Sequence, residues 1–223
     1  MMQDYFPTLA HGLVTSLSLT FCALVVGFML AIGLTVVRTL KTPGLNMLAR
    51  GFLVLFTGTP LLVQIFLIYY GPGQFAFIKE SVLWTLFAKP WFCAMLALAL
   101  NSAAYATLLF NGAMRAIPQG QWEACAALGM SKYQTLSILL PYALKRALPS
   151  YSNEVVLVFK GSSLASTITI MDIMGYAQRL NAQTYDTLAV FGAAGIIYLS
   201  INALLSLGMR GLEKKLLKFE QPA

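Results

Sequence analysis

Charged residues are scarce in this chain. Only 10% of its 223 residues are Asp, Glu, Lys or Arg, whereas 58% are hydrophobic. A soluble domain ordinarily devotes about a quarter of its residues to charge. The composition therefore excludes an ordinary soluble domain and favours a protein that lies in a membrane.

Histidine and cysteine are also rare. The single histidine is His11, and the three cysteines, Cys22, Cys93 and Cys125, are dispersed along the sequence. This spacing matches neither a zinc site nor a disulfide framework. One histidine also leaves no convincing Ser-His-Asp set. We therefore predict no metal site and no catalytic residue in this chain, and a surface position for His11.

A nucleotide-binding loop is missing as well. No segment has the pattern Gly-x-x-x-x-Gly-Lys-Ser/Thr that holds nucleotide phosphates. If the chain moves a solute against a gradient, the energy must come from another subunit. We therefore expect ATP and Mg²⁺ to be bound by a partner, with no cofactor in this chain.

Long apolar stretches dominate what is present. About 20 residues of helix cross the hydrocarbon core of a bilayer. Four stretches without any charged residue exceed that length, and a fifth candidate, 147–171, contains Glu154 and Lys160. We predict an all-α integral membrane protein with about five transmembrane helices in one domain, residues 1–223. The four uncharged stretches are 12–37, 51–78, 90–114 and 187–209.

Lys and Arg are distributed unevenly between the segments that join the predicted spans. With the N-terminus outside, eleven of the 15 lie on the inner side and three on the outer side. Inner loops of membrane proteins carry such an excess. We predict a periplasmic N-terminus and a cytoplasmic C-terminus. The inner set is Arg38, Lys41, Arg50, Arg115, Lys132, Lys145, Arg146, Arg210, Lys214, Lys215 and Lys218; the outer set is Lys79, Lys89 and Arg179.

A polar segment, about 115–141, separates the third and fourth predicted spans. Residues 121–128 are mostly good helix formers, and Gly129 is suited to the left-handed conformation that ends a helix. Ser131 and Gln134 form a capping box that predicts a second helix, which Pro141 is expected to end. A docking surface for a soluble partner and an ordinary loop between helices both fit these local signals.

This segment resembles the cytoplasmic coupling loop of ABC importer permeases. The resemblance rests on Glu123-Ala124 followed by Gly129 and Pro141, with Cys125 in place of a second alanine. Four further segments resemble the polar amino-acid importers, the branch of histidine and glutamine permeases, and they follow in the same order over nearly the whole chain. They are 12–20, 56–64, 101–105 and 160–164.

The resemblance implies a type I ABC importer permease fold in the bacterial inner (cytoplasmic) membrane. It implies ATP-driven import of a basic amino acid by alternating access. Arginine is the expected solute, because the sequence as a whole resembles permeases of Gram-negative arginine importers. The implied partners are a sister permease subunit, two ATP-binding cassette ATPase subunits, a periplasmic amino-acid-binding protein and membrane lipid. No nucleic-acid partner is expected.

Three residues depart from the pattern of this branch. Leu108 and Asn111 stand where the branch commonly has a glutamate and an arginine, and Gly161 stands where it often has an aspartate. Such losses suit a subunit whose non-identical sister keeps the missing groups. The resemblance therefore favours a heteromeric pair over a homodimer.

A proton-driven secondary carrier is the alternative function. Such a carrier would use Glu154 for protons and would need no ATPase. Many secondary carriers contain paired inverted repeats, and no internal repeat is evident in this sequence.

Glu154 and Lys160 are the main candidates for solute binding. A charge near mid-span costs about 2.5 to 3.5 kcal/mol on the insertion scale, so it normally faces a bundle interior or a wet cavity. Six residues of helix separate the two by about 120°, so each needs its own partner. We predict that Glu154 attracts the cationic side chain of the solute, with Asn153 and Ser163 as auxiliary contacts, and that Lys160 meets a carboxylate of the solute or the sister. A structural ion pair is the alternative for Glu154, and a buried pair or a snorkelling head group for Lys160.

The second predicted span contains a further candidate. Pro60 is expected to bend the helix, and Gly58 to let another backbone approach. Gln64 lies one turn beyond Pro60. Its amide either contacts the solute or forms a hydrogen bond to a neighbouring helix.

The coupling loop supplies the predicted contacts with the ATPase. Glu123 is expected to bond to a groove of the ATPase, with apolar contact beside it. The full predicted set is Trp122, Glu123, Ala124, Leu128, Gly129 and Met130. On the other side of the membrane, Asp172 and Asp186 flank a predicted outer loop, 172–186, as solvated charges or as contacts of the binding protein.

Overall fold

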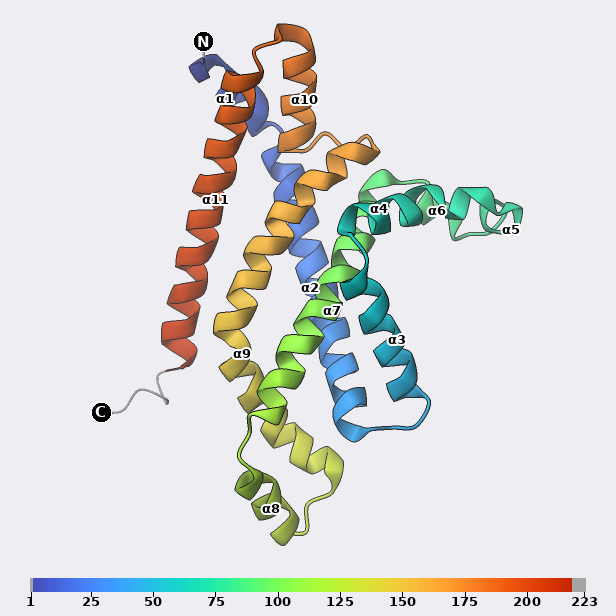
Figure 1. The fold of residues 1–223 in the computed structure, drawn as a ribbon, viewed down its shortest axis with the longest axis vertical. Helices are drawn as coiled ribbons and strands as arrows, with labels where there is room; N and C mark the ends of the chain where they lie inside the picture. The colour runs from blue at the N-terminus through green and yellow to red at the C-terminus, as the bar shows by residue number, and fades with distance from the viewer. Residues whose placement is uncertain (1, 218–223) are drawn as a thin grey trace.

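The computed structural model describes residues 2–217, and the side chains of residues 5–217, so the predicted inner cation Lys218 lies outside the described residues. All regular elements in the described part are helices (Figure 1). They are α1 (Met2–Ala10), α2 (Leu13–Leu40), α3 (Leu45–Gly58), α4 (Leu61–Tyr70), η1 (Pro72–Gln74), α5 (Ala76–Lys79), α6 (Trp84–Phe87), α7 (Pro90–Arg115), α8 (Gln119–Ala127), α9 (Lys132–Ser162), η2 (Ser163–Ile168), α10 (Ile173–Thr184) and α11 (Thr187–Leu216).

The predicted spans correspond to these helices. Residues 5–40, 90–115 and 187–216 each form a helix long and apolar enough to cross a membrane. Two bent pairs, α3 with α4 and α9–η2 with α10, bring the number to as many as five. The all-α class and the expected number of spans are therefore confirmed.

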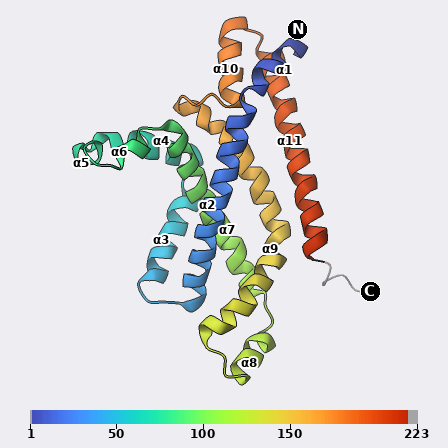
Figure 2. The ribbon, with the colours of Figure 1, turned by 180° about the vertical axis from the view of Figure 1, so that it is seen from behind.

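The centre of the molecule is the packing of α2 against α7, which lie side by side in Figures 1 and 2. Small residues make this approach possible, since α7 buries a series of alanines. A Cβ at Gly27 of α2 would lie 3.0 Å from the carbonyl oxygen of Ala99. Small residues are typical where helices pack closely inside a bilayer.

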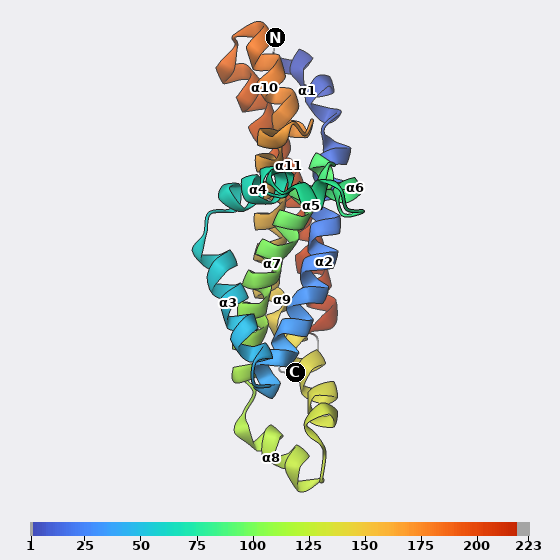
Figure 3. The same cartoon turned by 90° about the vertical axis from the view of Figure 1, so that its right-hand side faces the viewer.

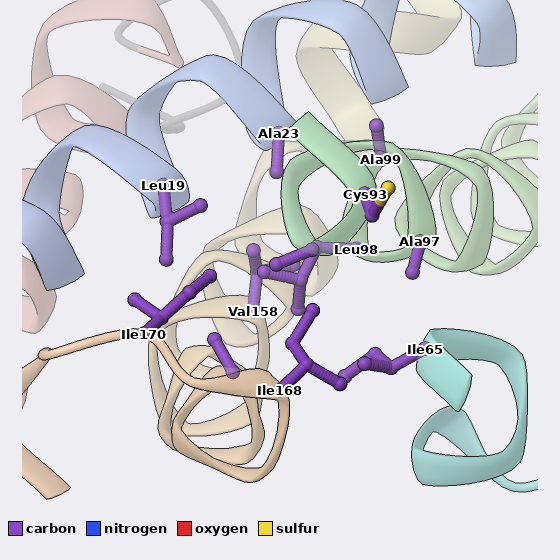
Figure 4. Close-up of a cluster of buried hydrophobic side chains, with 12 residues drawn as sticks. Leu19, Ala23, Ile65, Cys93, Ala97, Leu98, Ala99, Val158, Ile168 and Ile170 are labelled. Atoms are coloured by element: carbon purple, nitrogen blue, oxygen red, sulfur yellow. The ribbon is translucent and has the colours of Figure 1, made fainter. Parts of the chain in front are cut away.

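A buried apolar cluster joins five of the helical segments, α2, α4, α7, α9 and η2. Leu19 comes from α2, Leu98 from α7, Val158 from α9 and Ile65 from α4, and Figure 4 shows their side chains converging. The cluster attaches the second half of the broken span, α4, to the central pair. It thereby fixes the position of Gln64, the neighbour of Ile65.

The second span breaks at Pro60. The helical path bends by 109° between α3 and α4, and Thr59 and Pro60 have extended backbone between them. The predicted bend is therefore confirmed. The predicted role of Gly58 is wrong within this chain, because nothing lies within 4 Å of the position where its Cβ would be.

Helix α9 continues through Pro141 and Pro149. The prediction that Pro141 ends this helix is therefore wrong. A proline removes one backbone hydrogen bond and clashes with the preceding turn, but Leu139 and Ala143 on either side of Pro141 are buried in one apolar cluster. This packing holds the helix together, and the ribbon only changes direction near its lower end (Figure 1).

The expected outer loop 172–186 is mostly helix α10. Asp172 is fully buried, and its Oδ1 accepts a hydrogen bond of 2.7 Å from the Gly175 backbone N–H at the start of α10. Asp186 caps α11 and accepts hydrogen bonds from the Ala189 N–H and the Tyr5 hydroxyl. The prediction of a solvated or partner-facing Asp172 is therefore wrong, because an aspartate before a helix satisfies its free N–H groups.

The two ends of the molecule differ in character. Helices α1 and α10 lie at one end, and α8 lies beyond the spans at the opposite end (Figure 3). The short helices α5 and α6, in the connection predicted between the second and third spans, project sideways from the bundle (Figure 1).

Candidate functional site

Gln64 occupies the inside of the break between α3 and α4. Its side chain is 5% exposed. The amide Nε2 donates to the Phe56 carbonyl at 2.9 Å and to Thr59 at two oxygens. Asn101 on α7 donates to Gln64 Oε1 at 3.0 Å and to the same Phe56 carbonyl. These bonds satisfy backbone carbonyls that the break leaves without helical partners.

The placement of Gln64 therefore agrees with the hydrogen bond to a neighbouring helix, one of its two predicted roles. A contact between Gln64 and the solute stays a prediction. Asn101, which binds both Gln64 and the break, was not among the predicted site residues. The sequence signal for Asn101 was an Asn-Ser pair, which is polar, inside an apolar span that has no charged residue.

Glu154 lies on the buried side of α9 and is 6% exposed. Ser102 of α7 lies close enough to act on its charge. The Ser102 Oγ is itself buried and lacks a hydrogen-bond partner among the described residues. No lysine or arginine in the described part of the chain neutralises Glu154. A carboxylate held in this way is suited to receive a cation from outside the chain.

Asn153 and Lys160 share a different face of α9. Both side chains are exposed, and Leu157 between them is 51% exposed. Residues at these spacings follow one side of a helix. Ser163, which is half-buried, donates to the Lys160 carbonyl at 2.7 Å. The structure therefore separates Asn153 and Lys160 from the buried carboxylate of Glu154.

Helix α7 lies between the two polar groups of the spans. Asn101 faces Gln64 and the α3–α4 break, whereas its neighbour Ser102 faces Glu154. The predicted solute contacts thus lie in three separate places. Gln64 lies at the α3–α4 break, Glu154 lies on the buried side of α9, and Lys160 lies on the exposed face of α9. Each predicted role remains a prediction.

Helix α8 presents two unlike faces. Glu123, Ala124, Leu128 and Gly129 are exposed, with Leu128 80% exposed. Gln119 donates to Glu123 Oε1 at 2.8 Å, which holds that carboxylate along the exposed face. This arrangement provides a short solvent-facing surface with a carboxylate and an apolar side chain.

The opposite face of α8 packs against the end of the bundle. Cys125 is buried. Trp122 is half-buried and packs on the cluster that includes Met114 and Leu136. Trp122 was predicted to contact the ATPase, but its packing here attaches α8 to α7 and α9. Met130 is only partly exposed.

The junction between α8 and α9 has the predicted geometry. Gly129 has φ +70°. The Met130 N–H bonds to the Cys125 carbonyl, and the Gly129 N–H bonds to the Ala126 carbonyl. This pair of bonds is a Schellman motif. The capping box of Ser131 and Gln134 is present, with bonds of 2.8 and 3.3 Å, so the predicted helix–turn–helix is confirmed.

Comparison with known proteins gives consistent results. Residues 27–218 match the family "Binding-protein-dependent transport system inner membrane component". The chain is 63% identical to the arginine ABC transporter permease protein ArtM of Escherichia coli (strain K12), over 99% of both chains. It is 58% identical to ArtM of Haemophilus influenzae, over 99% of this chain and 97% of that protein.

Among solved structures, the chain is similar to a crystal structure of an amino acid ABC transporter with histidines. The TM-score is 0.83 at 27% sequence identity, and the match covers 96% of each chain. Members of this family are inner-membrane components of transport systems that depend on a binding protein. The chain belongs to the family of binding-protein-dependent transport system inner membrane components, and it has the fold of an ABC importer permease.

Proposed function

We propose that this chain is a membrane-spanning subunit of an ATP-driven importer for a basic amino acid, with arginine as the solute. The observation that carries the proposal is the buried carboxylate of Glu154, without a cation among the described residues, in a chain so similar to arginine permeases. A cationic solute side chain supplies the missing charge. The guanidinium of arginine forms two parallel hydrogen bonds with a carboxylate.

The energy comes from partner subunits. Two ATP-binding cassette ATPases bind ATP and Mg²⁺ and hydrolyse the nucleotide, and they dock on the exposed face of α8 around Glu123 and Leu128. When they close, α8 moves with them and the spans reorient around the solute by alternating access. A periplasmic binding protein delivers the amino acid at the opposite end, where α1 and α10 lie. This orientation places the N-terminus outside.

A non-identical sister permease completes the solute pathway. The exposed face of α9 with Asn153 and Lys160 supports this arrangement, because a charged side chain on a spanning helix needs a polar partner. Leu108, which stands where the branch commonly has a glutamate, is 46% exposed on α7. A sister that carries the carboxylate at this position would present it to the same pathway.

The proton-driven carrier has no support from the comparisons. The family and the relatives reported above are components of binding-protein-dependent and ABC transport systems. Proton-driven uptake is therefore the result that would contradict the proposal in the experiment described next.

Reconstituted transport tests the proposal. The chain is purified with its sister and ATPase subunits and placed in proteoliposomes that enclose ATP. We expect uptake of labelled arginine that requires both ATP and the binding protein and that a protonophore leaves unchanged. Uptake driven by a proton gradient in the absence of ATP would overturn the proposal.

A further inference from the structure

A cavity of about 300 Å³ lies where the ends of α2 and α7 meet α8. Arg38 and Lys41 come from the end of α2, Asn111 and Arg115 from the last turns of α7, and Trp122 from α8. The cavity therefore lies where two spanning helices leave the bilayer. The proposed transport of a basic amino acid gives these residues no role.

The cavity is strongly positive. Its lining has three cations, and no Asp or Glu of the described residues is part of it. Arg115 and the nearby Arg50 both repel the Arg38 guanidinium. The Arg38 Nε is buried and has no hydrogen-bond partner within residues 5–217. A buried charged donor without an acceptor is costly, so this arrangement calls for an anion.

The donors suit a phosphate group in particular. A guanidinium binds two phosphate oxygens at once, and charge-assisted bonds of this kind are among the strongest that proteins form. Basic cavities between transmembrane helices at the membrane surface bind the head groups of anionic lipids. Trp122, at the cavity wall, is a residue type that gathers at the level of lipid head groups.

We propose that this cavity binds the phosphate group of an anionic phospholipid. The cavity lies on the inward side of α8, where Trp122 packs, whereas Glu123 and Leu128 point away from the bundle. An ATPase docked on the exposed face would therefore place its carboxylates on the side of α8 opposite to the cavity. The bound lipid braces α8 against the ends of α2 and α7, because Trp122 belongs both to the cavity wall and to the coupling helix.

Native mass spectrometry of the assembled transporter with added phosphatidylglycerol tests this site. The double variant Arg38→Gln/Arg115→Gln is compared with the wild type and with Arg179→Gln/Arg210→Gln, which removes two exposed arginines elsewhere. We expect the first variant to retain about tenfold less phosphatidylglycerol, and the control to match the wild type. If the double variant does not assemble, Arg115→Gln alone, at the exposed rim, is expected to lose about threefold.

Two further arms identify the source of the phosphate. Phosphatidylcholine, which has no net charge, is expected to be retained equally by all variants. Inorganic phosphate is expected not to displace phosphatidylglycerol. Equal retention of phosphatidylglycerol by every variant would overturn the proposal, as would displacement by millimolar phosphate. So would a carboxylate of the sister or of an ATPase seated in the cavity in a structure of the complex.

Discussion

Glu154 combines features that rarely occur together. Its carboxylate belongs to a spanning helix and is buried in the bundle. It lies beside the Ser102 hydroxyl, which has no hydrogen-bond partner among the described residues, and no lysine or arginine of those residues neutralises it. Gln64, the other buried candidate, differs because its amide is fully engaged with the α3–α4 break. At the scale of single residues, Glu154 lacks a countercharge among the described residues, whereas Gln64 stabilises the break between α3 and α4.

The substitution Glu154→Gln separates solute binding from a structural role. It keeps the size of the side chain but removes the charge. We expect the apparent KM for arginine to rise about tenfold or more, since a hydrogen bond to a charged group is worth about 1.5 to 3 kcal/mol. The assembled complex should lose no thermal stability, because removing an uncompensated buried charge leaves no partner charge stranded. Uptake kinetics and thermal unfolding of the complex measure both effects.

Glu80→Gln is the matched control, because Glu80 is exposed in the segment between α4 and α7. It should leave the KM within about twofold of wild type, since an exposed charge far from the spans is screened by solvent. An unchanged KM for Glu154→Gln would remove this residue from the solute site. A loss of assembly would instead indicate an ion pair with another subunit.

At the scale of secondary structure, α8 and the turn that follows it form the element on which coupling depends. The Schellman motif and the capping box determine the direction in which α9 leaves α8. Trp122 and Cys125 attach the inner face of α8 to the bundle. A rigid turn and an attached helix transmit a displacement, whereas a loose loop would absorb it.

Gly129→Val is expected to uncouple ATP hydrolysis from uptake. Gly129 has φ +70°, and nothing lies within 4 Å of its missing Cβ. The effect is therefore backbone strain, about 1 to 3 kcal/mol for a residue forced into this region, and it reorients α8 without a clash. Arginine imported per ATP hydrolysed should fall severalfold, as measured in proteoliposomes.

Two control variants accompany Gly129→Val. Gly129→Asn should retain coupling, because asparagine tolerates the left-handed conformation. Gly44→Val should also retain it, although Gly44 has φ +77° and equally open surroundings, because it lies in the loop between α2 and α3. Normal coupling in Gly129→Val, or an equal loss in Gly44→Val, would contradict the role of α8.

The whole molecule has two chemically different ends on either side of the spans. One end carries α1, α10 and the helix caps Asp172, which is buried, and Asp186, which is half-buried; the other carries α8 and the positive cavity. The excess of Lys and Arg in the segments on the α8 side predicts that this end faces the cytoplasm.

Cysteine labelling measures the orientation. Tyr185 and Leu128 are 86% and 80% exposed at opposite ends. In right-side-out vesicles, a membrane-impermeant maleimide should label Tyr185→Cys and not Leu128→Cys, and inverted vesicles stripped of the ATPase should give the reverse. The wild type, whose Cys93 and Cys125 are buried and Cys22 half-buried, provides the background. Labelling of Leu128→Cys from outside would invert the proposed topology.

Local sequence signals predicted much of this fold. Apolar length determined the spans, Pro60 the break, and Gly129 with Ser131 and Gln134 the turn between α8 and α9, since each of these depends on a residue's own backbone preferences or on neighbours within one helical turn. Pro141 was misread for the opposite reason: the burial of Leu139 and Ala143, contributed by distant helices, outweighs its local cost.

The sequence by itself therefore determined that the chain is a helical membrane protein, that its second span breaks at Pro60 and that the chain turns at Gly129 after α8. Only the tertiary structure decided which polar groups meet: Asn101 with Gln64, Ser102 with Glu154, and Arg38 with Arg115 around one cavity. These partners come from helices that lie far apart along the chain, and local preferences do not specify which faces of two helices pack together. The pairing follows from the interlocking of small and large side chains across the whole bundle.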